Sequence, residues 1–339
     1  MKLLRWILLP FALLYGAIVA VRNRMFDWGL LSQYPVPIPS VGVGNLAVGG
    51  TGKSVVVAYL AGHFKSQKKV GMISRGYGRS TSGVRLASAE DTAQTIGDEA
   101  LQLLSQHPEI CVAVAEQRTA GIQQLLAAFP NLEVLLFDDC FQHRYIRPSH
   151  MLLTTAYNRP YFNDVVLPVG RLREAASATV RAHIIVVTKC PPTLSTKARE
   201  EFKAKLQLQP QQDVVFTTYT YDTNVYSKKE QLEVSALTAA PILLVTGIAD
   251  PLPLCAAMKA QGIAFEHKSF SDHHNFSTQE VAQLKSAAVK RKVLTTEKDF
   301  MRLAPLWGEE ANLFYWPIQL GFVTPADEQL IQDWLATVK

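Results

Sequence analysis

The stretch GNLAVGGTGKS, Gly44 to Ser54, decides the fold of this 339-residue chain. The apolar run SVGV precedes it, and the helix-compatible segment VVVAYLAGHF follows it. Between a strand and a helix, glycines let backbone N–H groups turn toward a pyrophosphate, and the first turn of the helix adds its positive dipole end. In such a loop Lys53 reaches the β- and γ-phosphates and the Ser54 hydroxyl binds Mg²⁺. The stretch therefore predicts an ATP-binding phosphate loop, made of Gly49, Gly50, Thr51, Gly52, Lys53 and Ser54.

The loop departs from the usual pattern G-x-x-x-x-G-K-[ST] at its first position. Ala47 stands where the first glycine is expected, and the adjacent pair Gly49 and Gly50 supplies the flexibility instead. An ordinary strand-to-helix turn is the alternative. The Lys-Ser ending between an apolar run and a helical segment favours the phosphate loop.

Short, almost continuous apolar runs alternate with segments of helical spacing after residue 40. The runs are SVGVG, KVGMIS, EICVAVA, LEVLLFDD, MLLTTA and HIIVVTK. They predict an α/β fold like that of P-loop NTPases, with a mostly parallel sheet and helices on both faces. A polar segment, Ser195 to Asp213, precedes a second set, which is VVFTTYTY, PILLVTGIA, AFEHKSF and KVLTTEK. We therefore expect three parts: a membrane-associated helix in residues 1–30, a P-loop core domain in 31–212, and a smaller α/β domain in 213–339 that closes over the cleft.

The N-terminus is apolar enough to meet a membrane. The segment from Trp6 to Val21 carries no charge, and it is slightly shorter than the ~20 residues that a spanning helix needs. No small-residue cleavage site of a signal peptide follows it. Because a phosphate loop follows closely and ATP is cytosolic, we expect a helix lying in or dipping into the cytoplasmic face of a membrane, with Lys2, Arg5, Arg22 and Arg24 near lipid phosphates. A buried helix of the main domain is the alternative.

Composition sets limits on the partners. The formal net charge is +5, which is too small and too dispersed to indicate a nucleic-acid partner. The four cysteines are scattered and lack metal-type spacing, which favours a reducing compartment. No obligate protein partner is evident.

Paired acids follow one of the apolar runs. Val134 to Phe137 lead into Asp138 and Asp139, at the carboxyl end of a strand, where α/β sheets bind their ligands. Two adjacent carboxylates are costly to hold together, and a bound cation compensates for them. We expect at least one of them to lie on the metal side of the nucleotide, although a single aspartate there is also common as a helix cap.

Other polar clusters follow the neighbouring runs. They are SRGYGR at 74–79, IGDE at 96–99, AEQR at 115–118, FQHRYIR at 141–147 and LPVGRLRE at 167–174. Each alone has a structural explanation as a turn, a helix cap or a solvated side chain. Together they predict a cationic rim that suits an anionic acceptor.

The second set contains FSDHHNFS at 270–277. Adjacent residues point in different directions, so we expect a single histidine paired with a carboxylate rather than a metal pair. If His273 reached across the cleft to Asp98, it could support Asp98 as a base for an attacking hydroxyl. A surface turn that caps the helix beginning near Ser277 is the alternative.

These motifs, GNLAVGGTGKS, SRGYGR, GDE, DDCFQH, LPVGRLRE, SDHHNFS and TTEKD, together resemble the tetraacyldisaccharide 4′-kinases, the inner-membrane lipid A kinases of Gram-negative bacteria. The resemblance covers nearly the whole chain. Two positions depart from the family pattern: Cys140 replaces a glycine, and Lys53-Ser54-Val55 replaces Lys-Thr-Pro. Cys140 brings a Cβ to a turn where close backbone packing is expected.

The resemblance implies transfer of the ATP γ-phosphate to the 4′-hydroxyl of a tetraacylated glucosamine disaccharide 1-phosphate, which gives lipid IVA. It implies ATP and Mg²⁺ at Lys53 and Ser54, a carboxylate motif at Asp138 and Asp139, and Asp98 as catalytic base assisted by His273. Glu99 would help with metal or water. The positions that it places at the acceptor and phosphate site are Arg75, Tyr77, Arg118, Gln142, His143, Arg171 and Glu174.

Two other functions fit parts of the sequence. A membrane-associated ATPase switch of the deviant phosphate-loop type also has a Gly-Gly-x-Gly-Lys loop, but its signature lysine before the glycines is replaced here by Val48. Such switches usually carry their membrane helix at the C-terminus. A GTP-binding assembly module would use VVTK at 186–189 to read the base, and strand-end Thr-Lys is too common to support it.

Overall fold

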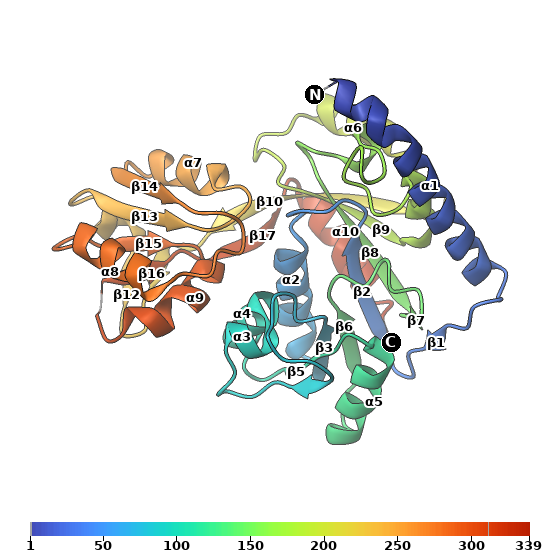
Figure 1. The fold of residues 1–339 in the computed structure, drawn as a ribbon, viewed down its shortest axis with the longest axis horizontal. Coiled ribbons are helices and arrows are strands. Elements are labelled where there is room, and N and C mark those ends of the chain that lie inside the picture. The colour runs from blue at the N-terminus through green and yellow to red at the C-terminus, as the bar shows by residue number, and fades with distance from the viewer. Residues whose placement is uncertain (1, 311) are drawn as a thin grey trace.

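The computed structural model describes residues 2–310 and 312–339, and these fold into a larger and a smaller α/β domain (Figure 1). Helix α1, Lys2–Asp27, runs along the side of the larger domain that faces away from the smaller one. The expected α/β fold with parallel sheets is confirmed.

The larger sheet has nine strands in the order β17-β10-β9-β8-β2-β6-β3-β5-β4. The seven strands from β10 to β5 are parallel, and the edge strands β17 and β4 are antiparallel to their neighbours. All six predicted runs form strands of this sheet. Its strands are β2 Ser40–Asn45, β3 Val70–Ser74, β4 Arg85–Leu86, β5 Cys111–Val114, β6 Val134–Phe137, β8 His150–Ala156, β9 Ile184–Thr188, β10 Asp213–Tyr221 and β17 Ile318–Phe322.

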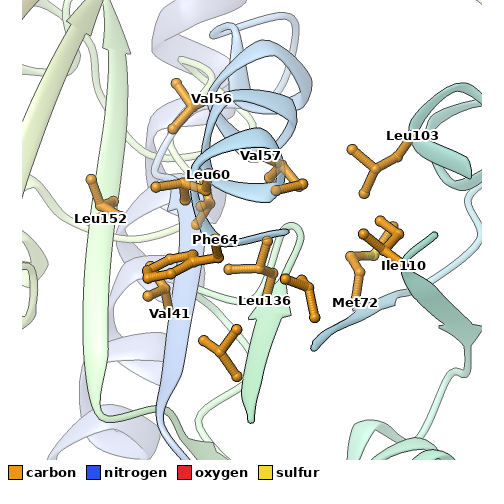
Figure 2. Close-up of a cluster of buried hydrophobic side chains, with 14 of the residues drawn as sticks. Val41, Val56, Val57, Leu60, Phe64, Met72, Leu103, Ile110, Leu136 and Leu152 are labelled. Carbon is orange, nitrogen blue, oxygen red and sulfur yellow. The ribbon is translucent and has the colours of Figure 1, made fainter. Parts of the chain in front are cut away.

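Helices cover both faces of this sheet. On one face, Val56 and Leu60 of α2 pack with Val41 and Leu136 of the sheet (Figure 2). On the other face, α5 and α6 pack against the alternate side chains of the same strands. The helices of this domain are α2 Lys53–Lys65, α3 Ala93–Ile96, α4 Asp98–Gln106, α5 Arg118–Ala128, α6 Thr196–Leu206 and α10 Pro325–Leu335. Two further short strands, β1 Tyr34–Pro35 and β7 Ile146–Arg147, pair with each other.

The smaller domain has a six-stranded sheet in the order β12-β11-β16-β15-β13-β14. Its strands are β11 Asn224–Tyr226, β12 Gln231–Glu233, β13 Ile242–Thr246, β14 Phe265–Ser269, β15 Val293–Thr295 and β16 Leu313–Tyr315, and its helices are α7 Leu252–Ala260, α8 Thr278–Ala287 and α9 Glu297–Trp307. Helix α9 contacts α4 of the larger domain. The Nε2 atoms of Gln102 and Gln106 on α4 both donate to the Glu297 carboxylate, at 2.8 and 2.5 Å.

The predicted domain boundary at residue 212 is wrong. Strand β10, which we expected to open the smaller domain, pairs in parallel with β9 in the larger sheet. The chain enters the smaller domain only after Tyr221, and it returns through β17 and α10 to the larger one. The apolar run VVFTTYTY predicts a strand but carries no information on which sheet accepts it. The polar segment before it contains helix α6, which packs Phe202 and Leu206 on the larger domain and so does not separate the two domains.

Helix α1 leaves most of its apolar side chains exposed. Trp6 is 72% exposed, and Phe11 and Leu14 are each 61% exposed. The segment Trp6–Asp27 is long and apolar enough to cross a membrane by length and composition. The alternative of a buried core helix is therefore wrong, because only a narrow face of α1, which includes Ala12 and Phe26, packs on the protein.

The basic residues of α1 were expected to lie near lipid phosphates, and Arg22 does not extend away from the protein in this way. Arg22 folds back onto the protein, where its Nη2 donates to the Gln142 carbonyl at 3.3 Å and its guanidinium lies over the Phe26 ring. Arg24 lies over the Trp28 ring. The side chains of Lys2 and Arg5 lie outside the described part of the structure.

Candidate active site

The predicted phosphate loop joins β2 to α2 at the carboxyl edge of the larger sheet, and α2 begins at Lys53. Gly49 and Gly52 have φ angles of 105° and 82°, a region that side chains other than glycine rarely adopt. A Cβ on Gly52 would also lie 2.7 Å from Tyr219 Oη. Glycine is required at residue 52 for both reasons.

Hydroxyl groups from neighbouring strands hold the loop in place. Thr51 Oγ1 lies 2.8 Å from Thr154 Oγ1 of β8, and Thr188 Oγ1 of β9 donates to the Thr51 carbonyl at 2.8 Å. Thr154, Thr188 and Tyr219 were not predicted from the sequence. Their only sequence signal is a polar residue at the end of an apolar strand.

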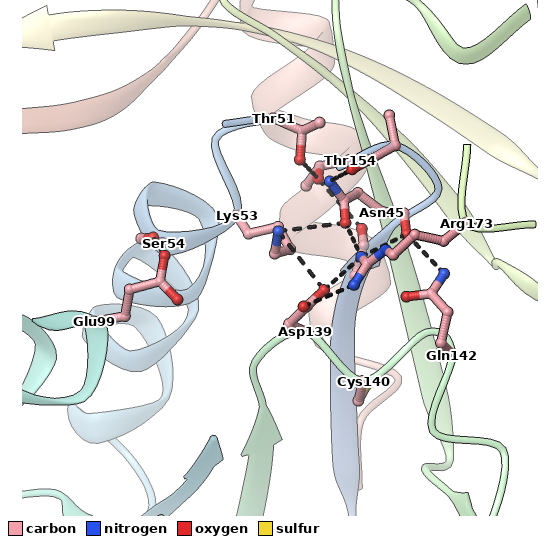
Figure 3. Close-up of polar contacts among 12 residues, drawn as sticks. Asn45, Thr51, Lys53, Ser54, Glu99, Asp139, Cys140, Gln142, Thr154 and Arg173 are labelled. Atoms are coloured by element: carbon pink, nitrogen blue, oxygen red, sulfur yellow. Dashed lines mark hydrogen bonds and ion pairs between the residues drawn. The ribbon is translucent and has the colours of Figure 1, made fainter. Parts of the chain in front are cut away.

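Lys53 points into a cluster of polar side chains (Figure 3). Its Nζ lies 3.3 Å from Asn45 Oδ1 and 3.7 Å from Asp139 Oδ1. Arg173 donates to both carboxylate oxygens of Asp139, at 2.9 and 2.7 Å, and also to Asn45 Oδ1. Burial raises the pKa of Asp139, but the hydrogen bonds from Arg173 and the charge of Lys53 outweigh it and hold the pKa below its usual value. Asp139 is therefore ionised and fixed beside Lys53.

Asp138 has a different environment from its neighbour. It is buried, and its Oδ1 has no hydrogen-bond partner within the described residues. Burial, together with the negative charge of Glu99, raises the pKa of Asp138. An unpartnered buried carboxylate oxygen beside a second acid is a position that a cation stabilises.

Glu99 lies between the two domains. Ser54 Oγ of the phosphate loop donates to Glu99 Oε1 at 2.9 Å, and Lys298 Nζ of α9 donates to the same oxygen at 2.8 Å. The charge of Lys298 lowers the pKa of Glu99 well below its usual value, and it outweighs the opposite effect of burial. Because the Ser54 proton is directed to Glu99, the lone pairs of the Ser54 oxygen remain for a metal ion.

These oxygens fit Mg²⁺ bound together with a nucleotide. A small cavity, lined in part by Ser54, Glu99 and Asp138, adjoins them. Within residues 2–310 and 312–339, no group of three or more His, Cys, Asp and Glu side chains is arranged to hold a metal by itself. A nucleotide-bound Mg²⁺ needs only one or two protein oxygens, because phosphates and waters complete its octahedron.

The smaller domain delivers His273 to Asp98 at the start of α4. His273 Nδ1 lies 3.0 Å from Asp98 Oδ2, and Arg302 Nε of α9 lies 3.4 Å from the same oxygen. The backbone of His273 is left-handed, with a φ of 56°, which histidine tolerates better than most residues. The contact across the domains is the one that the sequence analysis considered, whereas Arg302 was not foreseen.

Arg118 is a buried rim residue with unpaired donors, and it lies close enough to the half-buried His143 to affect it. Arg118, at the start of α5, is 3% exposed, and its Nε and Nη2 have no partner within the described residues. Burial and the charge of Arg118 lower the pKa of His143 to about 4. A buried guanidinium with unpaired donors at a helix N-terminus is suited to an anion.

The other rim residues differ in how open they are. Tyr77 is exposed, and its ring packs edge-on against His273. Arg75 is also exposed. Gln142 Nε2 donates to the Asn45 carbonyl at 3.0 Å. Arg171 is partly exposed and pairs with Asp164 at 2.9 Å.

Glu174 does not line the open rim. It is 1% exposed, and its Oε2 accepts hydrogen bonds from Asn23 of α1 and from Arg181, each at 2.6 Å. The family resemblance placed it among the residues that line the acceptor and phosphate site. The structure instead buries it between α1 and Arg181.

Cys140 fits its turn because Gly42 faces it. A Cβ on Gly42 would lie 2.6 Å from Cys140 Sγ, so the thiol occupies the space that the glycine leaves. Burial raises the pKa of the thiol to about 12, and it stays neutral. The departure from the family glycine therefore leaves the polar cluster around Asp139 intact.

Gly42→Ala is expected to destabilise the protein by about 1–3 kcal/mol, because overpacking displaces the Cys140 and Met151 side chains. The change in the free energy of unfolding would be measured by urea denaturation. The double variant Gly42→Ala/Cys140→Gly should recover part of the loss. A Gly42→Ala variant as stable as the parent would contradict the close approach.

Comparison with known proteins gives the family. The model of the family described as tetraacyldisaccharide-1-P 4′-kinase matches residues 4–337. The chain belongs to this family. The tetraacyldisaccharide 4′-kinase of Flavobacterium johnsoniae is 40% identical over 323 residues, which cover 95% of this chain and 94% of the relative. The tetraacyldisaccharide 4′-kinase of Bacteroides thetaiotaomicron is 38% identical over 358 residues and covers 100% of this chain and 94% of the relative.

A solved structure of the same family has the same fold. LpxK from Aquifex aeolicus, crystallised in complex with ATP, is 27% identical and superimposes with a TM-score of 0.79 over 99% of both chains. Membership of the tetraacyldisaccharide 4′-kinase family thus accounts for both domains and for α1.

Proposed function

We propose that the protein transfers the γ-phosphate of ATP to the 4′-hydroxyl of a tetraacylated glucosamine disaccharide 1-phosphate, giving lipid IVA in lipid A biosynthesis. Its membership of the 4′-kinase family and its likeness to an ATP-bound relative support this activity. The observation that carries it in the geometry is the contact between His273 and Asp98, the residue before Glu99, which accepts a hydrogen bond from Ser54 of the phosphate loop. That contact joins the two domains at the place where the acceptor must meet the nucleotide.

The nucleotide lies on the phosphate loop in this proposal. The backbone N–H groups of Gly49 to Ser54 and the Lys53 ammonium bind the β- and γ-phosphates, in agreement with the left-handed glycines and the position of Lys53. Bound Mg²⁺ neutralises charge that develops on the transferring phosphoryl group. Ser54 and Asp138 are assigned as its protein ligands, and Glu99 orients Ser54. Asp139, whose two oxygens are engaged by Arg173, holds Lys53 in position.

Asp98 is the proposed general base. As the acceptor oxygen forms its bond to the γ-phosphorus, Asp98 accepts the proton of the 4′-hydroxyl, and the bond from the γ-phosphorus to the β,γ-bridging oxygen breaks. ADP leaves with the electron pair. His273 and Arg302 hold the carboxylate of Asp98 in place from the smaller domain. The two domains meeting over the site exclude water and limit wasteful hydrolysis.

The anionic acceptor meets the cationic rim. Arg118 has unpaired buried donors suited to a phosphate or phosphoryl oxygen. The other side chains that we assign to the acceptor and phosphate site are Arg75, Tyr77, Gln142, His143 and Arg171. Glu174 is assigned a supporting role instead, because it is buried beneath α1.

Helix α1 is proposed to lie on the cytoplasmic face of the inner membrane. Its exposed apolar side chains would enter the lipid surface, where the acylated acceptor resides. ATP is available on that side only. Contact of α1 with lipid thus brings the phosphate loop and the sugar to the same surface.

Replacing Phe11 and Leu14 by serine is expected to weaken vesicle binding by about tenfold for each side chain, because burying one large apolar side chain contributes about 1.5–3 kcal/mol. Co-sedimentation with vesicles of anionic phospholipid measures the partition. Val289→Ser, which changes an exposed apolar residue of the smaller domain, is the matched control. Unchanged partition of the double variant would show that α1 does not enter the lipid surface.

One assay tests the activity directly. The protein is incubated with ATP labelled on its γ-phosphate, with and without a tetraacylated disaccharide 1-phosphate in detergent micelles. Label that appears on the lipid and depends on the acceptor supports the kinase. Phosphate release that vesicles stimulate, with no labelled lipid, would instead indicate a membrane-associated ATPase switch.

A further inference from the structure

The inner face of α1 is bonded to the segment that holds Asp139. Tyr15 Oη donates to the Arg173 carbonyl at 2.9 Å, and Asn23 Nδ2 donates to the adjacent Glu174 carboxylate at 2.6 Å. These bonds lie on the narrow packed face of the helix, away from the exposed apolar side chains. Tyr15 and Asn23 are the two α1 side chains that contact residues 173 and 174 by hydrogen bonds within the described structure.

The same segment is fixed on its other side to the lead-in of the phosphate loop. The Arg173 N–H donates to the Leu46 carbonyl at 2.7 Å, and the Val48 N–H donates to the Arg171 carbonyl at 2.8 Å. The Arg173 side chain then holds both Asp139 and Asn45, the two groups that face Lys53. Residues 171–174 therefore lie between α1 and the phosphate loop.

Glu174 connects residues 171–174, through Arg181, to the loop that contains Phe141. Arg181 donates to Glu174 Oε2 at 2.6 Å and to the Phe141 carbonyl at 3.3 Å, and its guanidinium lies over the Phe141 ring. Phe141 follows Asp139 and Cys140 directly in the chain. With 1% of Glu174 exposed, a lost partner cannot be replaced freely by water, and such a loss is costly. Through Glu174 and Arg181, Asn23 thus supports both the segment 171–174 and the loop that carries Asp139 and Phe141.

We propose that Tyr15 and Asn23 are positioning residues of the phosphoryl-transfer site, which act by holding Arg173 and Glu174 so that Arg173 can fix Asp139 beside Lys53. Helix α1 in this account has two separate faces. The outer apolar face contacts lipid, and the inner polar face completes the support of the active site. The inference rests on the proposed function, because it concerns the rate of that reaction.

The test changes only the inner polar face of α1, by removing the hydroxyl of Tyr15 or the amide of Asn23. Tyr15→Phe is expected to lower kcat about three- to tenfold and Asn23→Ala about tenfold or more, since a neutral hydrogen bond contributes about 0.5–1.5 kcal/mol and one to a charged group about 1.5–3 kcal/mol. The acceptor is presented in detergent micelles, so that membrane partition does not limit the rate. The KM for ATP and the binding to anionic phospholipid vesicles are expected to match the parent.

Tyr226→Phe is the matched control. It removes a tyrosine hydroxyl that bonds Asp222 in the smaller domain, at 3.2 Å, and kcat should be unchanged. Thermal unfolding of each variant is followed by circular dichroism. Tyr15→Phe removes a single oxygen, so the test does not depend on Asn23→Ala folding well.

A double-mutant cycle with Arg173→Ala distinguishes positioning from general destabilisation. If Tyr15 acts through Arg173, Tyr15→Phe causes no further loss of kcat in the Arg173→Ala background. Fully additive losses, or a parental kcat in Tyr15→Phe and Asn23→Ala, would overturn the inference. Absence of lipid phosphorylation by the parent protein would instead refute the proposed function, so the two failures are distinguishable.

Discussion

Lys53→Ala is expected to lower kcat for lipid phosphorylation by about 10²–10³-fold, because the ammonium is a fixed cation directed at charge that develops in the transition state. Lys53 is held by Asn45 and Asp139, so its charge is positioned before the nucleotide arrives. The rate would be measured with γ-labelled ATP at saturating acceptor.

Lys65→Ala is the control for this substitution. Lys65 ends the same helix and pairs with Glu109, away from the phosphate loop. Lys65→Ala removes one positive charge, as Lys53→Ala does, and should leave the rate unchanged. Near-parental turnover of a folded Lys53→Ala protein would refute the assignment of the loop as the nucleotide site.

Asp98→Asn is expected to lower kcat by about 10²–10⁴-fold, the range that a positioned general base contributes. The amide keeps the size of the carboxylate but cannot accept the proton of the acceptor hydroxyl. The KM for ATP should stay within a few-fold of the parent value, because Asp98 contacts His273 and Arg302 rather than the phosphate loop.

The contact with His273 predicts non-additivity. His273→Ala should lower the rate in the parent but cause little further loss in Asp98→Asn, since both act on one proton transfer. His274→Ala is the matched control, because His274 pairs with Glu280 inside the smaller domain. A parental rate for Asp98→Asn at saturating substrates would assign the base to another acid.

Local patterns in the sequence predict most strands but not the path of the chain between domains. Apolar runs such as Val134–Phe137 and Ile184–Thr188 are buried on both faces, and their composition alone indicates parallel strands. Strand β10 has a similar composition, yet it is joined to the larger sheet by pairing with β9. Pairing partners that lie far apart in sequence, such as β17 on β10, are set by tertiary packing.

Some residues of the candidate site could be predicted from the sequence, and others depend on tertiary packing. The phosphate loop, the paired aspartates and the rim follow strand ends, so their gathering at one edge of the sheet could be predicted from order alone. The hydroxyls of Thr154 and Thr188, the Lys298 contact to Glu99 and the Arg302 contact to Asp98 could not, because each depends on where a distant element docks. Glu174 shows the opposite error, because the family resemblance assigned it to the acceptor site, whereas it is buried beneath α1.

A crystal structure of the protein with a non-hydrolysable ATP analogue and Mg²⁺ would test the central assignment most directly. The account predicts the triphosphate on the N–H groups of Gly49 to Ser54, the metal bonded to Ser54 Oγ, and the terminal phosphorus facing Asp98. A nucleotide bound elsewhere, or one on the loop with its terminal phosphate directed away from both Asp98 and Asp139, would contradict it.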